Sequence, residues 1–156
     1  MKVRAFVFED NDTLRSMMSS VLEGRGYEVM SFPDPGFCPM VLNRECPCPH
    51  KHACADIIIT DINMPSMTGL EFLENRRQNG CKVKNRAVMS GRWSEEELDK
   101  ARKLGCKIFE KPFSFADLGR WLEECEKRLD PKRKLSDLSR HELETESLRA
   151  QQGKPG

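Results

Sequence analysis

Short apolar segments alternate with segments of helical periodicity along residues 1–129 of the chain. The segments with the length and apolar content of buried strands are residues 3–8, 27–32, 56–60, 86–89 and 108–109. The segments whose apolar side chains recur on one helical face are residues 11–25, 68–77, a helix opening at 94, and 114–129. Strands that alternate with helices favour a parallel sheet covered on both faces, so the pattern predicts a doubly wound α/β fold.

Polar residues mark where several of these elements begin. The first helix is expected to start at Asn11 or Asp12, because such side chains accept hydrogen bonds from the unpaired N–H groups of a first turn. Ser94, followed three residues later by Glu97, matches a capping box. A turn signal at residues 33–36 precedes a weaker helical segment at 37–42.

Residues with reactive or charged side chains lie at the ends of four predicted strands. They are Glu9 and Asp10 after the first strand, Asp61 after the third, Ser90 after the fourth and Lys111 after the last. In parallel sheets, functional groups gather at the carboxyl ends of the strands, near the point where strand order switches. We therefore expect these side chains to meet at one edge of the sheet.

The chemistry of this set favours phosphoryl transfer. Three carboxylates at one edge repel each other and need a cation, and hard oxygen ligands suit Mg²⁺. A carboxylate such as Asp61 can act as the nucleophile and form an aspartyl-phosphate. Ser90 and Lys111 can then stabilise the phosphoryl oxygens by a hydrogen bond and a positive charge.

Four sequence elements together resemble the receiver domain of two-component response regulators. They are Phe8-Glu9-Asp10-Asn11, Asp61-Ile62-Asn63-Met64-Pro65 with Gly69 following, Ser90-Gly91, and Lys111-Pro112-Phe113. The resemblance covers about residues 1–129 and implies a flavodoxin-like (βα)₅ fold, a five-stranded sheet of order 2-1-3-4-5. The chain resembles a receiver of the stand-alone, CheY-like kind.

The resemblance also implies a metal site at the phosphoacceptor. Asp61 matches the phosphoacceptor aspartate, and Glu9 and Asp10 match the acids that hold Mg²⁺ (or Mn²⁺) directly or through water. Asn63 matches the residue whose backbone carbonyl completes that metal site.

At the ends of the other two strands, the resemblance implies a switch hydroxyl and a lysine. The sequence also departs from the family pattern at one position. Ser90 matches the switch hydroxyl and Lys111 the family lysine, with a cis peptide expected between Lys111 and Pro112. Three residues before Lys111 the family carries Tyr or Phe, but here Ile108 stands, and the neighbouring Phe109 is expected to face the other side of a regular strand. This departure calls into question the usual coupling of a rotating aromatic ring to the switch hydroxyl. Arg92 and Trp93, beside Ser90, either belong to a partner surface or simply cover the following helix.

A second candidate metal site lies in a loop insertion at about residues 38–55. Its members are the thiols and imidazoles of Cys38, Cys46, Cys48, Cys54, His50 and His52. The set is open to three interpretations: a loop with incidental thiols, a Zn²⁺ (or iron–sulfur) site, or a redox sensor. It lacks the paired Cys-x₂-Cys spacing typical of zinc sites. The remaining cysteines, Cys81, Cys106 and Cys125, are expected to be packing residues.

Composition limits the remaining function classes. The 26 basic and 25 acidic residues give a net charge of +1, which removes the simplest electrostatic case for binding nucleic acid or a membrane surface. No apolar run approaches the roughly 20 residues of a membrane helix, and the N-terminus does not resemble an export signal. We therefore expect a cytoplasmic protein with reduced cysteines. Residues 1–130 are expected to form the receiver domain and the polar residues 131–156 a mobile or helical tail.

These observations predict a single-domain response regulator rather than an enzyme that acts on other substrates. A sensor histidine kinase or phosphotransfer protein would donate the phosphoryl group to Asp61, and the signal would pass to an unknown protein target by contact. Homodimerisation on phosphorylation is left open. The alternative is a metal- or redox-sensing scaffold with a vestigial receiver site. A phosphatase of the haloacid-dehalogenase type is disfavoured, since it needs a second Asp where Asn63 stands.

Overall fold

A parallel sheet of five strands organises the part of the chain that the structure describes. The computed structural model describes residues 1–37 and 52–136 of the chain. The strands are β1 (Arg4–Phe8), β2 (Glu28–Phe32), β3 (Ile57–Asp61), β4 (Asn85–Ser90) and β5 (Lys107–Glu110). All neighbouring strands are parallel and their order is β2-β1-β3-β4-β5, which confirms the predicted flavodoxin-like sheet.

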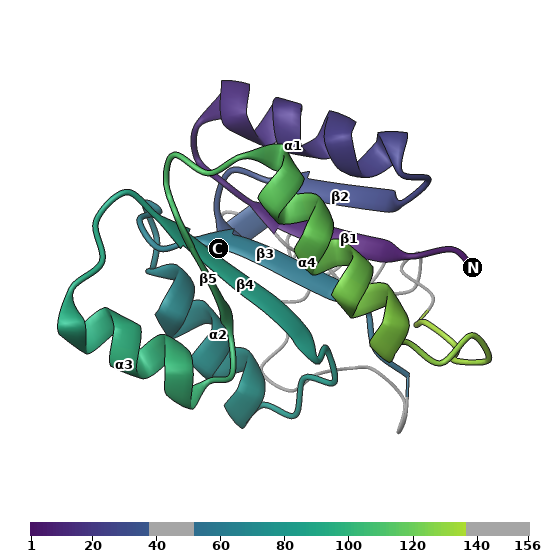
Figure 1. The fold of residues 1–156 in the computed structure, drawn as a ribbon. Coiled ribbons are helices and arrows are strands. Elements are labelled where there is room, and N and C mark those ends of the chain that lie inside the picture. Colours follow the sequence, from purple (N-terminus) through teal and green to yellow (C-terminus); the bar gives the residue numbers. More distant parts are fainter. Residues whose placement is uncertain (38–51, 137–156) are drawn as a thin grey trace, which may run out of the picture.

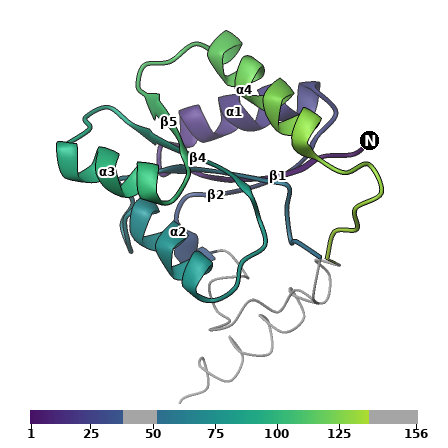
Figure 2. The same cartoon turned by 60° about the horizontal axis from the view of Figure 1, so that its bottom comes forward.

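Four α-helices in the described part cover the two faces of the sheet (Figure 1). They are α1 (Asp12–Gly24), α2 (Gly69–Gln78), α3 (Glu95–Lys103) and α4 (Phe115–Arg128). Figures 1 and 2 show α1 and α4 on one face and α2 and α3 on the other. No helix among residues 1–37 and 52–136 is both long and apolar enough to cross a membrane.

Alternating side chains of the strands supply two separate cores. On one face Ile57 and Ile59 pack with residues of α1 and α4, whereas on the other Ile58 packs with residues of α2 and α3. Every residue of β3 is buried, as expected for the central strand of a sheet covered on both faces. This double burial fixes the register of β3 and hence the position of Asp61 at its carboxyl end.

The helix starts follow the polar signals in the sequence. The side chain of Asn11 accepts a hydrogen bond from Leu14 N, so Asn11 rather than Asp12 caps α1. Ser94 and Glu97 form the predicted capping box of α3. Of the weak helical segment at 37–42, only Phe37 is described, at the end of a 3₁₀ turn (Pro35–Phe37); the rest lies outside the described residues.

The chain after α4 returns to the amino end of β3. Arg133 donates two hydrogen bonds to the buried carboxylate of Asp56, and Ser136 N donates to Ala53 O at 2.8 Å. Residues 131–136, assigned to the tail in the sequence analysis, therefore pack against the domain. The reason is a buried carboxylate 77 positions away in sequence, which needs the Arg133 guanidinium as its partner.

Candidate functional site

Strand register brings the predicted site residues to one edge of the sheet. Phe8 of β1 lies opposite Thr60 of β3, so the next residues, Glu9 and Asp61, leave the sheet side by side. In the same way Ser90 of β4 lies opposite Glu110 of β5, and Lys111 N donates to Ser90 O at 2.7 Å. The peptide between Lys111 and Pro112 is cis, as the family resemblance implied.

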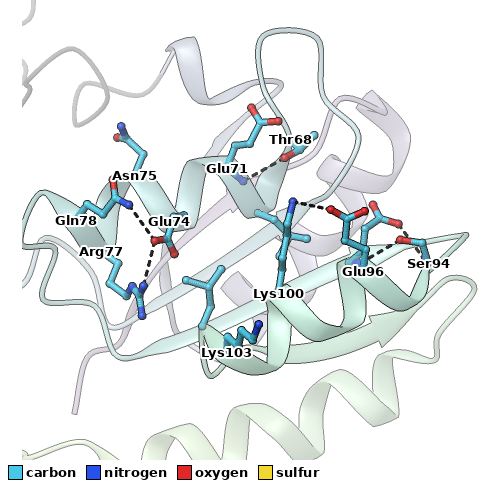
Figure 3. A pocket seen from close by; sticks show the side chains of 13 residues that line it. Thr68, Glu71, Glu74, Asn75, Arg77, Gln78, Ser94, Glu96, Lys100 and Lys103 are labelled. Carbon is cyan, nitrogen blue, oxygen red and sulfur yellow. Dashed lines mark hydrogen bonds and ion pairs between the residues drawn. The ribbon is translucent and has the colours of Figure 1, made fainter.

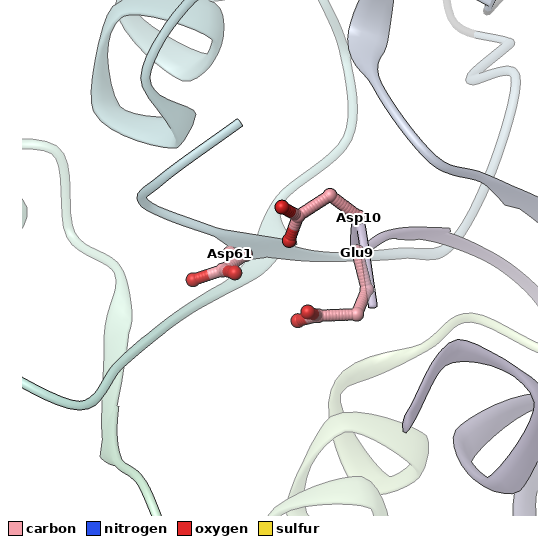
Figure 4. Close-up of side chains that lie close together, drawn as sticks. All are labelled: Glu9, Asp10 and Asp61. Carbon is pink, nitrogen blue, oxygen red and sulfur yellow. The ribbon is translucent and has the colours of Figure 1, made fainter. Parts of the chain in front are cut away.

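Glu9, Asp10 and Asp61 form an acidic cluster (Figure 4). One carboxylate oxygen from each lies within 4.8 Å of the others. Glu9 is 1% exposed and Asp61 5%, whereas Asp10 is exposed at the rim. Lys111 Nζ lies 2.9 Å from Glu9 Oε2 and 3.2 Å from Asp61 Oδ2. One ammonium among three carboxylates leaves an excess of negative charge, so the donor set fits a divalent cation that prefers oxygen ligands.

Burial and neighbouring charges shift the pKa values of Glu9 and Lys111. Burial, with the neighbouring charge of Asp61, raises the pKa of the Glu9 carboxyl, and the hydrogen bond from Lys111 offsets this only in part. Burial by itself disfavours the Lys111 ammonium, but the hydrogen bonds and charges of Glu9 and Asp61 outweigh it and raise the pKa of Lys111. Lys111 is therefore positively charged at neutral pH and can pair with an anionic phosphoryl oxygen.

Ser90 and Asn63 flank the cluster without belonging to it. The buried hydroxyl of Ser90 donates to Arg92 O at 2.8 Å and accepts from Arg92 N at 3.2 Å. Asn63 is exposed in the loop that follows Asp61. The structure thus brings Glu9, Asp10, Asp61 and Lys111 together. The Ser90 hydroxyl, by contrast, is hydrogen-bonded within the turn that follows β4.

Gly69 allows α2 to begin directly against the end of β3. Gly69 N donates to Ile62 O at 2.8 Å, and a Cβ built on Gly69 would lie 2.1 Å from the backbone oxygen of Asp61. No side chain can be accommodated there without moving the Asp61 backbone. The backbone position of Asp61 therefore requires a glycine at position 69.

The Gly69→Ala variant is expected to lose about 1–3 kcal/mol of unfolding free energy, because the new methyl group displaces the backbone at Asp61. Urea denaturation measures this loss. Gly24→Ala is the matched control, since nothing lies within 4 Å of a Cβ at Gly24. Equal stability of the two variants would contradict the close approach at Gly69.

Asp34 is a positioning residue that the sequence analysis missed. Its buried carboxylate accepts from Ser66 N and Gly36 N, each at 2.8 Å, and from the Ser66 hydroxyl. Burial opposes ionisation, but the three donors outweigh it and lower the pKa of Asp34. Asp34 therefore ties the turn after β2 to the loop after Asp61. The sequence signalled only a turn, since nothing local indicates that Ser66 is its partner.

Replacing Asp34 with Asn is expected to cost about 1–3 kcal/mol at neutral pH, because three hydrogen bonds lose their charged acceptor. A carboxyl with a lowered folded-state pKa stabilises the protein above its unfolded pKa of about 4 and loses that contribution as pH falls through the folded value. Urea denaturation of wild type and Asp34→Asn across pH 3–7 should therefore converge at the acid end. A constant difference across the whole range, or one shared by the exposed-site variant Asp99→Asn, would contradict this role.

The second candidate metal site receives no support. Cys38, Cys46, Cys48 and His50 lie outside the described residues, so only two of its six members can be placed. Cys54 is buried at 3% exposure and His52 is half-buried. In the described ranges, the acidic cluster is the single group of three or more metal-ligating side chains. No finding therefore supports Zn²⁺ binding at this second site.

The other cysteines pack as predicted. Cys125 of α4 is fully buried, and Cys81 and Cys106 pack against the opposite core. Burial raises the pKa of the Cys106 and Cys125 thiols to about 11 each. These two groups are protonated at neutral pH and suited to packing rather than to nucleophilic chemistry.

A groove of about 720 Å³ runs between α2 and α3 (Figure 3). Two ion pairs lie among its lining residues, Arg77 with Glu74 and Lys100 with Glu96. None of the cluster carboxylates lines it. The chemistry of the described residues is thus concentrated at the carboxyl ends of the strands.

Comparison with known proteins decides the family. A family model described as the response regulator receiver domain matches residues 5–123 of the chain. The chain belongs to this family. It is therefore a receiver domain of two-component phosphorelay signalling, and the alternative of a metal-sensing scaffold is not supported.

Two curated relatives have similar sequences. The transcriptional regulatory protein FixJ of Azorhizobium caulinodans is 32% identical over 117 residues, which span 70% of this chain and 48% of FixJ. A probable transcriptional regulatory protein of Picosynechococcus is 32% identical over 120 residues, which span 75% of this chain and 46% of that protein. The receiver thus spans about half the length of the curated relatives it matches.

Solved structures agree in fold and in extent. The chemotaxis response regulator CheY4 of Vibrio cholerae is 26% identical with a TM-score of 0.65, over 80% of this chain and 99% of that one. The N-terminal domain of an uncharacterized Wolinella succinogenes protein is 27% identical with a TM-score of 0.67, over 80% of this chain and 94% of that one.

Proposed function

We propose that Asp61 of this receiver accepts a phosphoryl group from a phosphohistidine of a sensor kinase or phosphotransfer protein. The observation that supports this most directly is the convergence of Glu9, Asp10, Asp61 and Lys111 at the carboxyl edge of the sheet. A carboxylate oxygen of Asp61 attacks the phosphorus, the P–N bond to the donor histidine breaks, and the histidine nitrogen keeps the bonding electron pair. The domain acts on itself and on its donor, which fits a signalling role.

Glu9, Asp10 and Asp61 are the residues that would hold a divalent ion, Mg²⁺ or Mn²⁺, with the backbone carbonyl of Asn63 as a further proposed ligand. The bound ion supplies positive charge to the phosphoryl oxygens. Lys111 holds Glu9 and Asp61 in place and offers its ammonium to a phosphoryl oxygen. Ser90 donates its hydroxyl proton to another oxygen of the transferred group.

We further propose that phosphorylation is read by a protein partner at the face formed by α3, β5 and α4. A groove of about 400 Å³ lies between β5 and α4, lined by charged residues together with apolar residues that include Phe113 and Trp121. Its position beside Lys111 would let a change at the phosphoacceptor reach a bound partner. We place the receiver at residues 1–130, with residues 131–136 packed against it.

Incubation with acetyl phosphate and Mg²⁺ tests the phosphoacceptor directly. We expect the protein to gain the mass of one phosphoryl group, and borohydride to convert the modified aspartate to homoserine at position 61. EDTA should prevent the gain. Modification elsewhere, or a gain unaffected by EDTA, would overturn the proposal. Size-exclusion chromatography of the same samples separates a monomeric phosphorylated form from a homodimer.

A further inference from the structure

The Ser90 hydroxyl is already hydrogen-bonded in this structure. It donates its proton to Arg92 O at 2.8 Å and accepts from Arg92 N at 3.2 Å. A serine hydroxyl carries one proton and can donate only one full hydrogen bond at a time. If the hydroxyl donates to a phosphoryl oxygen on Asp61, its bond to Arg92 O must be given up.

The next residue along this turn is tied to the neighbouring strand. Trp93 Nε1 donates to the backbone oxygen of Phe109 in β5 at 3.1 Å. The Trp93 ring also packs against the core cluster on the α2–α3 face, as does Ile108. Trp93 is therefore a bridge from the turn after β4 to β5.

The turn and the bridge share one rigid unit. Arg92 O, which Ser90 binds, belongs to the same planar peptide group as Trp93 N. Turning that plane away from Ser90 changes the ψ angle of Arg92 and the φ angle of Trp93, and the φ angle of Trp93 helps to set the direction of its side chain. A change in the hydrogen bond of Ser90 is therefore transmitted to the indole over a single peptide.

Strand β5 does not supply an aromatic side chain that could respond to a change at Ser90. Its aromatic residue, Phe109, is buried on the opposite face, with its ring centroid 5.0 Å from that of Phe113 and 5.9 Å from that of Trp121. On the face of the Trp93 indole, β5 presents the aliphatic side chain of Ile108. The aromatic group positioned to respond to Ser90 thus comes from the turn itself.

We propose that Trp93 is the residue that couples the state of Asp61 to β5: recruitment of the Ser90 hydroxyl by the phosphoryl group releases the Arg92 carbonyl, and the Trp93 indole gives up its hydrogen bond to Phe109. This inference rests on the proposed phosphorylation of Asp61. Trp93 acts here as a positioning residue, and the rearranged indole changes the surface that a partner meets next to α3 and β5.

The two tryptophans of the chain make the proposal measurable. A ¹H–¹⁵N spectrum contains one indole N–H signal for Trp93 and one for Trp121, and the Trp121→Phe variant assigns them. Mg²⁺ is added first, then beryllofluoride as a phosphoryl mimic, with its binding followed independently by ¹⁹F spectroscopy. We expect the Trp93 indole proton to shift upfield and exchange faster when beryllofluoride binds, with a smaller change at Trp121.

Variants of Ser90 provide the matched controls. Ser90→Ala removes the donor, so bound beryllofluoride should leave the Trp93 signal where Mg²⁺ alone leaves it. Ser90→Thr retains a hydroxyl and should restore the shift. If ¹⁹F spectra show bound beryllofluoride in the wild type while the Trp93 signal stays fixed, or if Ser90→Ala still shifts it, the coupling is wrong although the phosphoacceptor assignment stands. If neither beryllofluoride nor a phosphoryl group binds, the proposed function itself fails.

Discussion

The Asp61→Asn variant is expected to incorporate no phosphoryl group from acetyl phosphate and to bind no beryllofluoride. An amide oxygen is a far weaker nucleophile than a carboxylate, and the change removes one of the three charges that attract the metal. The fold should persist. The substitution removes an ion pair with Lys111 together with a repulsion from Glu9, so the unfolding free energy should change by less than about 1 kcal/mol.

Asp99→Asn is the control for this experiment. Asp99 is an exposed carboxylate on α3 that pairs with Lys103, and it lies outside the acidic cluster. Its variant should be phosphorylated like the wild type. Phosphoryl incorporation by Asp61→Asn, mapped by borohydride trapping to any other residue, would refute the assignment of Asp61.

The Lys111→Met variant is expected to lose about 3 kcal/mol of unfolding free energy in EDTA. Methionine keeps much of the side-chain volume, but Glu9 and Asp61 remain buried without their cationic partner. Mg²⁺ should restore part of this stability, and more than it adds to the wild type, because the bound ion then compensates the same carboxylates. Urea denaturation in EDTA and in Mg²⁺ measures both effects.

Lys103→Met is the matched change at an exposed lysine, whose side chain is 77% exposed and pairs with Asp99. Exposed pairs of this kind contribute about 1 kcal/mol at most. A Lys111 variant no less stable than the Lys103 variant would show that the cluster does not depend on the ammonium. Loss of stability in Lys111→Met without any response to Mg²⁺ would contradict metal binding by the carboxylates.

The sequence alone predicts the sheet and the convergence of its reactive groups, for a physical reason. Strands buried on both faces read as short apolar runs, and the polar residues that follow each run mark the carboxyl end of the strand. Once the strands are known to be parallel, Glu9, Asp61 and Lys111 must leave the sheet at the same edge. The order of strands, by contrast, came from the family resemblance.

What the sequence could not predict are contacts between side chains far apart in the chain. Asp34 and Ser66 are separated by 32 positions, and Trp93 reaches a carbonyl 16 positions away. Neither contact follows from periodicity, since both depend on how turns are placed in space. The same holds for Arg133, since nothing in the local sequence of residues 131–136 indicates its buried partner Asp56, which lies just before β3.

The Asp56–Arg133 ion pair holds the chain after α4 against the amino end of β3. Asp56 immediately precedes β3 and Asp61 ends it, so a strand rising about 3.3 Å per residue places the Cα atoms of the two residues roughly 17 Å apart. We expect events at Asp61 to leave this anchor undisturbed. A spectroscopic label on the exposed Lys134 would then be a fixed reference point. The displacement of the turn at residues 91–94 could be measured from it within the same molecule.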